Sequence, residues 1–307
     1  PDGVMVVSFY TAKPWFTDRL FATLKSAVGY TPIIMKDNRH DWFQPITAFV
    51  VGAPVVRGEL SVPEDQRNIY SLISDYKASP QTKILTDDWP FIYVMPVAVD
   101  GPYLAIVALV LLFAIYPSRR LLFARHEPAN WQMFFMGAAF LLIELQAIAR
   151  LNLIYGANWL SAAVVINCIL VLALAGNWWV SRSSNLFWKW LPWLFALLFG
   201  LLLASWALPV DAALSAAIAD PGLGKLFATT VTVLPLFVAA LIFSTSFSRL
   251  KDPSVGLSFN LLGAVIGAML EYMSNYVGLS GLVAVGAGFY VAAFIAALCQ
   301  RRTGQVS

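Results

Sequence analysis

The pattern of apolar and polar residues divides this 307-residue chain near Asp100. Before that point, short apolar runs alternate with polar segments, and most of the acidic residues lie there. From Tyr103 to Leu298 nearly every residue is apolar, in seven long runs. We therefore expect part of a water-soluble domain over residues 1–100, with its linker, and a multi-pass membrane domain over residues 101–307.

The soluble region has the pattern of an α/β fold. The β-rich run Val4–Phe9 predicts a buried strand of a parallel sheet. After Pro14, apolar residues recur at helical spacing until Gly29, which predicts one helix. Two further strands are predicted at 33–35 and 46–51. A strand, helix, strand, strand order is typical of the closing part of an α/β sheet.

Three further expectations concern the same region. The helix after Pro14 has a polar face that includes Asp18, Arg19 and Lys25. An amphipathic helix is predicted from Pro63 to Tyr76. The turn Pro1-Asp2-Gly3 leads directly into a strand, so we expect these residues to be part of a longer α/β domain.

The seven apolar runs predict a compact bundle of six or seven transmembrane helices. A helix needs about 20 residues to cross the hydrocarbon core, so six runs are long enough and the first is short. The first run becomes long enough only if it continues through Pro117 to Leu122. The runs are approximately 103–116, 131–149, 158–180, 187–208, 226–248, 255–276 and 279–298.

The composition agrees with a membrane protein. Hydrophobic residues make up 59% of the chain and charged residues 12%, whereas soluble proteins average about 25% charged residues. The net charge is only +3, and no run of Lys and Arg suggests binding to nucleic acid. Lipid must therefore cover part of the apolar surface, and the lipid bilayer is the expected partner.

The basic residues lie mainly between the apolar runs and predict an orientation. If all seven runs span, the positive-inside rule makes one side cytoplasmic and puts the soluble domain outside. If the first run does not cross, the charge bias agrees with a cytoplasmic soluble domain, and we expect this arrangement in a plasma (inner) membrane. The other side then has only Arg150 and Lys225. The residues on the basic side are Arg119, Arg120, Arg125, Arg182, Lys189, Arg249, Lys251, Arg301 and Arg302.

Cysteine and histidine residues indicate neither a metal site nor a disulfide. Cys168 and Cys299 fall inside apolar runs, where a small buried hydrophobic residue is the ordinary role of cysteine. His40 and His126 have no ligand-like spacing to Cys, Asp or Glu. We therefore expect no metal.

Two carboxylates, Glu144 and Glu271, lie well inside apolar runs. An ionised carboxylate costs several kcal/mol there and rarely faces lipid. Helical spacing places Asn260, Gly263 and Gly267 on the face of Glu271, and two glycines four apart let a neighbouring helix approach closely.

These carboxylates have two interpretations. Arg150 is a possible partner of Glu271, and Asn167 a possible donor to Glu144. One interpretation is a polar site or an ion path within the bundle. The other is an interhelical clamp that fixes packing, which the absence of a helix break around a pocket favours.

Asp87 and Asp88 are the candidate residues of the soluble region. Adjacent carboxylates repel each other, so a position with both is typically compensated by a helix N-terminus, a cation or a cationic substrate. A polyamine or another amine acceptor would fit. The alternative is a turn before Pro90 in which Asp serves as a local cap.

Several segments, in this order, resemble one known family. Pro1–Phe9 looks like the post-strand turn and late strand of a class I S-adenosylmethionine-dependent fold. This resemblance implies that residues 1–100 are the C-terminal portion of a Rossmann-like, methyltransferase-type α/β domain. Thr86–Pro90 is similar to the Thr-Asp-Asp-x-Pro element of membrane-fused spermidine synthase-like proteins. The stretches Gly137–Ala175 and Asn260–Tyr272 resemble their membrane helices.

The resemblance implies a membrane-bound transferase. It would move an aminopropyl or methyl group from S-adenosylmethionine, or its decarboxylated form, to an amine or a membrane-associated acceptor, with Asp87 and Asp88 on the acceptor side. The cofactor-binding parts of the family lie upstream of the strand with which this chain starts, so no cofactor-binding or catalytic residue is assigned. The alternatives are a transporter-like bundle and a membrane scaffold, each with a degenerate soluble domain.

Overall fold

The computed structural model describes most of the chain, which divides into two compact units. One unit is Pro1–Thr86 with Pro90–Ala98, and the other is Asp87–Trp89 with Val99–Ser307. His40, Asp100 and His126 lie outside the described residues. The described residues are 3–11, 13–37, 46–67, 69–94, 101–124, 127–156, 159–207 and 220–302.

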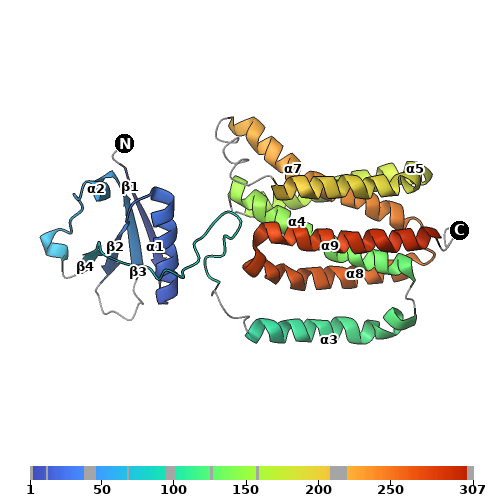
Figure 1. Cartoon of the computed structure of the whole chain (residues 1–307), viewed down its shortest axis with the longest axis horizontal. Helices are drawn as coiled ribbons and strands as arrows, with labels where there is room; N and C mark the ends of the chain where they lie inside the picture. Colours follow the sequence, from blue (N-terminus) through green and yellow to red (C-terminus); the bar gives the residue numbers. More distant parts are fainter. Residues whose placement is uncertain are drawn as a thin grey trace. The chain divides into compact units, whose positions relative to one another are not determined.

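The first unit contains a four-stranded sheet in the order β1-β3-β2-β4 (Figure 1). Its strands are β1 (Val4–Tyr10), β2 (Ile33–Asp37), β3 (Ile46–Gly52) and β4 (Tyr70–Ile73). β3 pairs antiparallel with both β1 and β2, and β4 pairs antiparallel with β2. β1 and β2 therefore run parallel to each other, with the reversed β3 between them.

Two sequence predictions for this unit are wrong. β1 is not a buried strand of a parallel sheet, because its described pairing is antiparallel and Val4, Met5 and Val6 are about half exposed. A uniformly apolar strand does not indicate whether its neighbours run parallel or antiparallel. The helix predicted over Pro63–Tyr76 is replaced by a short 3₁₀ turn, η1 (Glu64–Gln66), and by β4, because pairing with β2 overrides a weak helical pattern.

The predicted helix after Pro14 is confirmed as α1 (Pro14–Val28). Gly29 follows it with φ of 78°, a left-handed conformation that suits glycine. Phe16, Leu20 and Phe21 pack against Ile34 and Phe49 of the sheet and form the core of this unit. A very short helix, α2 (Ala53–Val56), follows β3.

Arg19 does not lie on a solvent-facing side of α1 as predicted, since it is only 1% exposed. Its Nε donates to the carbonyl of Lys83 at 3.2 Å, and its Nη1 donates to Ile92 at 3.0 Å and to Val94 at 2.6 Å. Burial lowers the pKa of the guanidinium. Lys83 and the segment 91–94 therefore cover a part of α1 that its helical pattern assigns to solvent.

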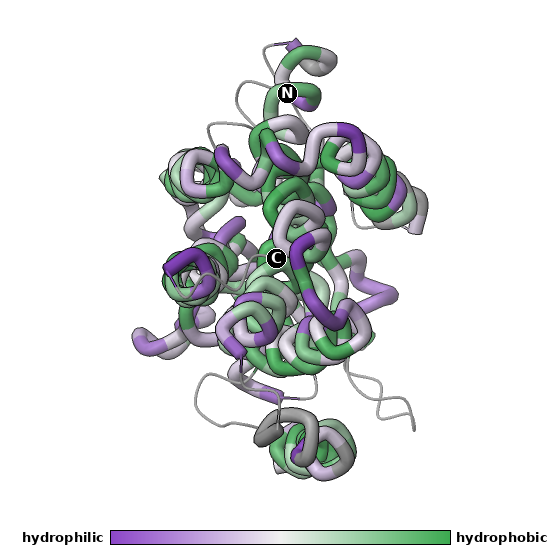
Figure 2. Tube along the Cα trace, turned by 90° about the vertical axis from the view of Figure 1, so that its right-hand side faces the viewer, coloured by the Kyte–Doolittle hydropathy of each residue, from purple (hydrophilic) through white to green (hydrophobic). Residues whose placement is uncertain are grey.

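The second unit is helical and strongly apolar, and hydrophobic colours dominate its helices in Figure 2. Within the described residues, four stretches are long and apolar enough to cross a membrane: Pro128–Tyr155, Ile166–Ala207, Gly222–Phe247 and Pro253–Arg302. The apolar part of the first helix, Gly101–Tyr116, is shorter. The elements are α3 (Gly101–Ala124), α4 (Pro128–Tyr155), α5 (Trp159–Ala207), α7 (Pro221–Phe247), α8 (Pro253–Leu270), η2 (Glu271–Met273) and α9 (Ser274–Arg302).

α4 is the central helix and packs mainly on α8 and α9, while α5 packs mainly on α7 (Figure 1). The glycines of α8 permit the close approach predicted for them. A Cβ on Gly263 would lie 1.9 Å from the carbonyl oxygen of Phe134, and one on Gly267 would lie 2.5 Å from that of Ala138. The neighbouring helix is thus α4, and the small residues set the spacing of the pair.

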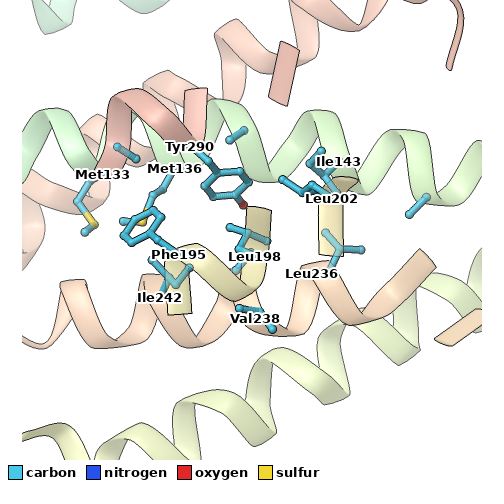
Figure 3. Close-up of a cluster of buried hydrophobic side chains, with 14 of the residues drawn as sticks. Met133, Met136, Ile143, Phe195, Leu198, Leu202, Leu236, Val238, Ile242 and Tyr290 are labelled. Atoms are coloured by element: carbon cyan, nitrogen blue, oxygen red, sulfur yellow. The ribbon is translucent and has the colours of Figure 1, made fainter. Parts of the chain in front are cut away.

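The core of the bundle joins five helices, α4, α5, α7, α8 and α9. Figure 3 shows Tyr290 of α9 beside Met136 of α4 and Phe195 and Leu198 of α5, and all four are buried. Cys168, by contrast, is exposed on the outside of the bundle, as is Cys299, so the expectation of buried cysteines is wrong. If lipid covers these helices, an exposed thiol keeps an apolar environment without being inside the protein.

Candidate functional site

The helical unit contains a break in α9 at Gly278, whose φ of 77° and ψ of 177° are not helical. The helix restarts at Leu279, so the amides that follow need hydrogen-bond acceptors from outside the helix. A Cβ on Gly278 would lie 2.3 Å from Oδ2 of Asp88. Only glycine fits this position because both its conformation and its contact exclude a side chain.

Asp88 and Trp89 occupy this break. The Oδ1 atom of Asp88 accepts a hydrogen bond from the backbone N–H of Ser280 at 2.7 Å, and its carbonyl oxygen accepts from Leu279 at 2.8 Å. The indole Nε1 of Trp89 donates to the carbonyl of Asn275 at 2.6 Å. Asp88 therefore acts as the N-cap of the long part of α9, where a negative charge also favours the helix dipole.

Arg150 lies at the same end of the bundle and is 6% exposed. Its Nη1 donates to the backbone oxygen of Ser205 at 2.6 Å and to the Ser205 hydroxyl at 3.1 Å. It also interacts electrostatically with Asp88. Its hydrogen bonds thus go to Ser205, and within the described residues no ion pair joins it to Glu271.

The bundle also contains a cavity of about 350 Å³. α4, α5, α7, α8 and α9 all contribute to its wall. Four of its residues carry polar side-chain groups: Glu144, Asn177, Asn260 and Tyr290. The remaining lining is apolar and includes Phe140 and Phe243. The structure thus places Glu144 and Asn260, two of the predicted candidates, at one cavity.

Some polar groups of this cavity have hydrogen-bond partners within the described residues and others have none. Asn260 donates from Nδ2 to the carbonyl of Met133 at 3.0 Å, and Asn177 accepts a hydrogen bond from Ser244. The buried hydroxyl of Tyr290 has no hydrogen-bond partner in the described part of the chain. Glu144 forms neither a hydrogen bond nor an ion pair with any described residue.

Asn167 is not a donor to Glu144 in this structure. Its Nδ2 bonds the carbonyl of Ala163 within α5 at 2.7 Å. It lines a different, largely apolar groove between α5 and α7, together with Cys168 and Thr229. The side-chain donor proposed for Glu144 is therefore occupied within its own helix.

Glu271 lies in η2, away from the cavity residues named above. Glu271 interacts electrostatically with Tyr103. Tyr103 stacks on Tyr272 with ring centroids 3.9 Å apart and donates to the carbonyl of Met269. The two intramembrane carboxylates thus belong to two separate places in the bundle.

Sequence reasoning missed several residues of these sites. Gly278, Trp89 and Ser205 form part of the α9 break and the Arg150 contact, and Tyr290 lies on the cavity wall. A tyrosine in the middle of an apolar run was a usable signal, since a buried phenol requires a partner. Asn177 lies near the end of the apolar run 158–180, where capping alone accounts for an asparagine.

The described residues include no group of three or more His, Cys, Asp or Glu side chains that could hold a metal ion. Comparison of the chain with family models, with curated proteins and with solved structures finds no match. The resemblance to spermidine synthase-like membrane proteins therefore rests on the segments quoted for it.

Proposed function

We propose that the chain is part of a membrane-bound transferase similar to the spermidine synthase-like proteins. The observation that carries the proposal is the topology of β1, α1, β2 and β3. Two parallel strands joined by a helix, with a reversed strand between them, suit the end of a mostly parallel α/β sheet that carries an antiparallel strand. Such sheets bind nucleotide-type cofactors at the carboxyl ends of their parallel strands.

The proposed reaction uses a sulfonium donor. A deprotonated amine or another nucleophile of the acceptor attacks the aminopropyl or methyl carbon attached to the sulfur, and the carbon–sulfur bond breaks. The sulfur keeps the electron pair and leaves as a thioether. The donor is S-adenosylmethionine or its decarboxylated form, and its binding site lies outside the residues assigned here.

In this proposal Asp87 and Asp88 lie on the acceptor side. Asp88 acts by positioning, because its carboxylate is bound to the Ser280 amide and its carbonyl to the Leu279 amide. It holds the segment Asp87–Trp89 at the break of α9, while Asp87 is the candidate for acceptor contact. Variants at the two positions should then differ: Asp87→Asn raises KM for the acceptor, whereas Asp88→Asn lowers protein stability as well.

The proposal includes six or seven membrane spans. The 42-residue stretch Ile166–Ala207 would extend about 63 Å as one helix, twice the hydrocarbon thickness of about 30 Å. Its kink at Ser183 and the break at Gly278 each divide a long stretch into two spans. Together with α4 and α7 this makes six, and α3 is a seventh or a half-span. The basic side then faces the cytoplasm, in a plasma (inner) membrane.

Donor binding tests the transferase proposal. The full-length protein in lipid nanodiscs is titrated calorimetrically with S-adenosylmethionine and with its decarboxylated form, and transfer of the labelled group to a set of amines is measured. Saturable heat with one donor and label in the amine product are expected. No heat and no transfer with either donor would remove the proposal.

A transporter-like bundle is the second candidate, favoured by the position of Glu144 in an intramembrane cavity. Flux of labelled amines or protons into proteoliposomes separates the two. Flux that is lost in Glu144→Gln and needs no donor supports transport. If neither flux nor group transfer is observed, a membrane scaffold is the remaining function.

A further inference from the structure

We infer that the cavity between α4, α5, α7, α8 and α9 binds a small amphipathic amine, whose ammonium group pairs with Glu144. The inference rests on the geometry of the bundle alone. It does not depend on the proposed transferase activity, and its test uses no sulfonium donor.

The first reason is the situation of Glu144. Its carboxylate is partly buried in an apolar stretch of α4 and forms no ion pair or hydrogen bond within the described residues. An ionised carboxylate in such surroundings costs several kcal/mol unless a cation accompanies it. Arg150 is the basic residue nearest in sequence on the same helix, but it donates hydrogen bonds to Ser205 and does not line the cavity. A ligand is therefore the available source of the cation.

The second reason is the size and chemistry of the cavity. About 350 Å³ is at the small end of the range of about 300–1,000 Å³ that is typical of ligand pockets. Most of its wall is apolar, with the rings of Phe140 and Phe243 and the side chain of Leu141. A cation alone would leave this surface empty, so the ligand combines a cationic head with a short apolar body.

The third reason is the number of acceptors. An ammonium group has three N–H donors and no acceptor. Glu144 supplies carboxylate oxygens, and Asn260 uses its Nδ2 for Met133, which leaves its Oδ1 without a hydrogen bond among the described residues. Aromatic rings can also face an ammonium favourably. An anionic ligand would be repelled by Glu144, and a divalent metal would need more oxygen ligands.

The fourth reason is a way in from the bilayer. Asn177, on the cavity wall, is exposed on the outside of the bundle, and Phe140 and Phe243 are partly exposed. In a bundle surrounded by lipid, an amphipathic amine in the membrane reaches this wall without crossing the protein. The apolar groove between α5 and α7 lacks a carboxylate in its wall, so the same ligand is not expected there.

Binding of radiolabelled octylamine to the full-length protein in nanodiscs tests the inference, with empty nanodiscs subtracted. We expect saturable binding that is displaced by unlabelled octylamine and not by octanol, which has the same length without the charge. Glu144→Gln should weaken binding by roughly tenfold to a hundredfold, the effect of losing a charged hydrogen bond. Glu271→Gln is the matched control, since this second intramembrane carboxylate does not line the cavity, and it should bind as the unmodified protein does.

A second variant separates loss of binding from loss of folding. Ala173→Phe adds a ring at the cavity wall and leaves Glu144 unchanged, so it should weaken octylamine binding while the protein keeps its elution volume. Equal binding to the unmodified protein, Glu144→Gln and Ala173→Phe would overturn the inference. So would displacement by octanol as effective as that by octylamine, or the absence of saturable binding.

Discussion

The carboxylate of Asp88 accepts a hydrogen bond from the backbone amide of Ser280 at 2.7 Å, across 192 residues of sequence. An N-cap is ordinarily the residue directly before its helix. Here Gly278 interrupts α9, and the cap comes from the segment Asp87–Trp89, far upstream in the chain. A folded α9 thus depends on residues that precede all the membrane helices in sequence.

Substitution of Asp88 should destabilise the helical unit in two steps. Asn is as good a cap as Asp, so Asp88→Asn removes only the charge that interacts with Arg150. Asp88→Ala removes the cap as well and should lower the unfolding free energy by about 1 kcal/mol more. Thermal unfolding in detergent, followed by the circular dichroism of the helices, measures the melting temperature. It should fall from the unmodified protein to Asp88→Asn and further to Asp88→Ala.

The control for this series is Asp220, the local cap of α7. Its side chain accepts longer hydrogen bonds from Gly222 at 3.3 Å and Leu223 at 3.4 Å, and these are exposed. Asp220→Ala should therefore cost less than Asp88→Ala. Equal stability of the unmodified protein and Asp88→Ala would mean that the bond to Ser280 contributes nothing to α9.

Gly263 should be among the least replaceable residues of the bundle. A methyl group there meets the backbone oxygen of Phe134 at 1.9 Å, so Gly263→Ala forces α8 away from α4. Overpacking of this kind costs about 1–3 kcal/mol. We expect a lower melting temperature in detergent and a smaller fraction of the protein in the folded peak on gel filtration.

Gly288 provides the matched control within α9. A Cβ there has no atom within 4 Å, and its backbone is helical, so Gly288→Ala should be neutral or stabilising by up to about 1 kcal/mol. A Gly263→Ala protein as stable as Gly288→Ala would show that α4 and α8 are not in close contact.

Much of the fold could be predicted because hydrophobic periodicity is a local property. The run 131–149 became α4, and the pattern from Pro14 to Gly29 became α1 with its predicted ends. Arg19 could not be predicted as buried, because residues that lie more than 60 positions later cover it. The direction of β1 relative to its neighbours likewise depends on pairing, which a uniformly apolar strand does not encode.

The candidate sites were predictable as residue types but not as constellations. Glu144, Asn260 and Arg150 were identified because polar groups are costly in apolar helices. Their partners depend on which helices meet, and one helical face can meet several neighbours. Arg150 therefore donates to Ser205 and not to Glu271. Asp88 accepts from a backbone amide of α9, which no spacing within Thr86–Pro90 indicates.

Arg19→Met should lower the unfolding free energy of the first unit, although the helical pattern of α1 assigns Arg19 to the solvent-facing side. The substitution keeps the length of the side chain but leaves the carbonyls of Lys83, Ile92 and Val94 without their donor, which costs about 3 kcal/mol. The reporter is the labelling rate of a cysteine placed at Val50, which is 3% exposed in β3, in a background with Cys168→Ala and Cys299→Ala. Faster labelling is expected.

The control is Lys25→Met on the same helix. Lys25 is exposed near the C-terminal end of α1, so its loss should change stability by no more than about 0.5 kcal/mol. If the reporter cysteine is labelled at the same rate in Arg19→Met and Lys25→Met, the guanidinium does not hold Lys83 and the segment 91–94 on α1.

Tyr76 should make the stability of the first unit fall at alkaline pH. Its hydroxyl donates to Oδ1 of Asp18 at 2.6 Å, and burial, followed by this bond and the charge of Asp18, raises the pKa of the phenol. The folded unit then keeps the proton after the unfolded chain has lost it near pH 10. The contribution of Tyr76 is therefore complete below about pH 10 and declines as the pH rises further.

The same reporter at Val50 measures this effect, because the ionisation of its thiol is the same in every variant and cancels when variants are compared at one pH. Tyr76→Phe should label faster than the unmodified unit at pH 9, by the loss of about 1 kcal/mol for one hydrogen bond. The difference between the two should narrow between about pH 10 and pH 12, since only the tyrosine loses its bond there. Tyr10→Phe, which changes an exposed ring of β1, controls for the general effect of removing a phenol. If the difference in labelling rate between Tyr76→Phe and the unmodified protein stays constant over this range, the Asp18 contact does not hold the Tyr76 proton.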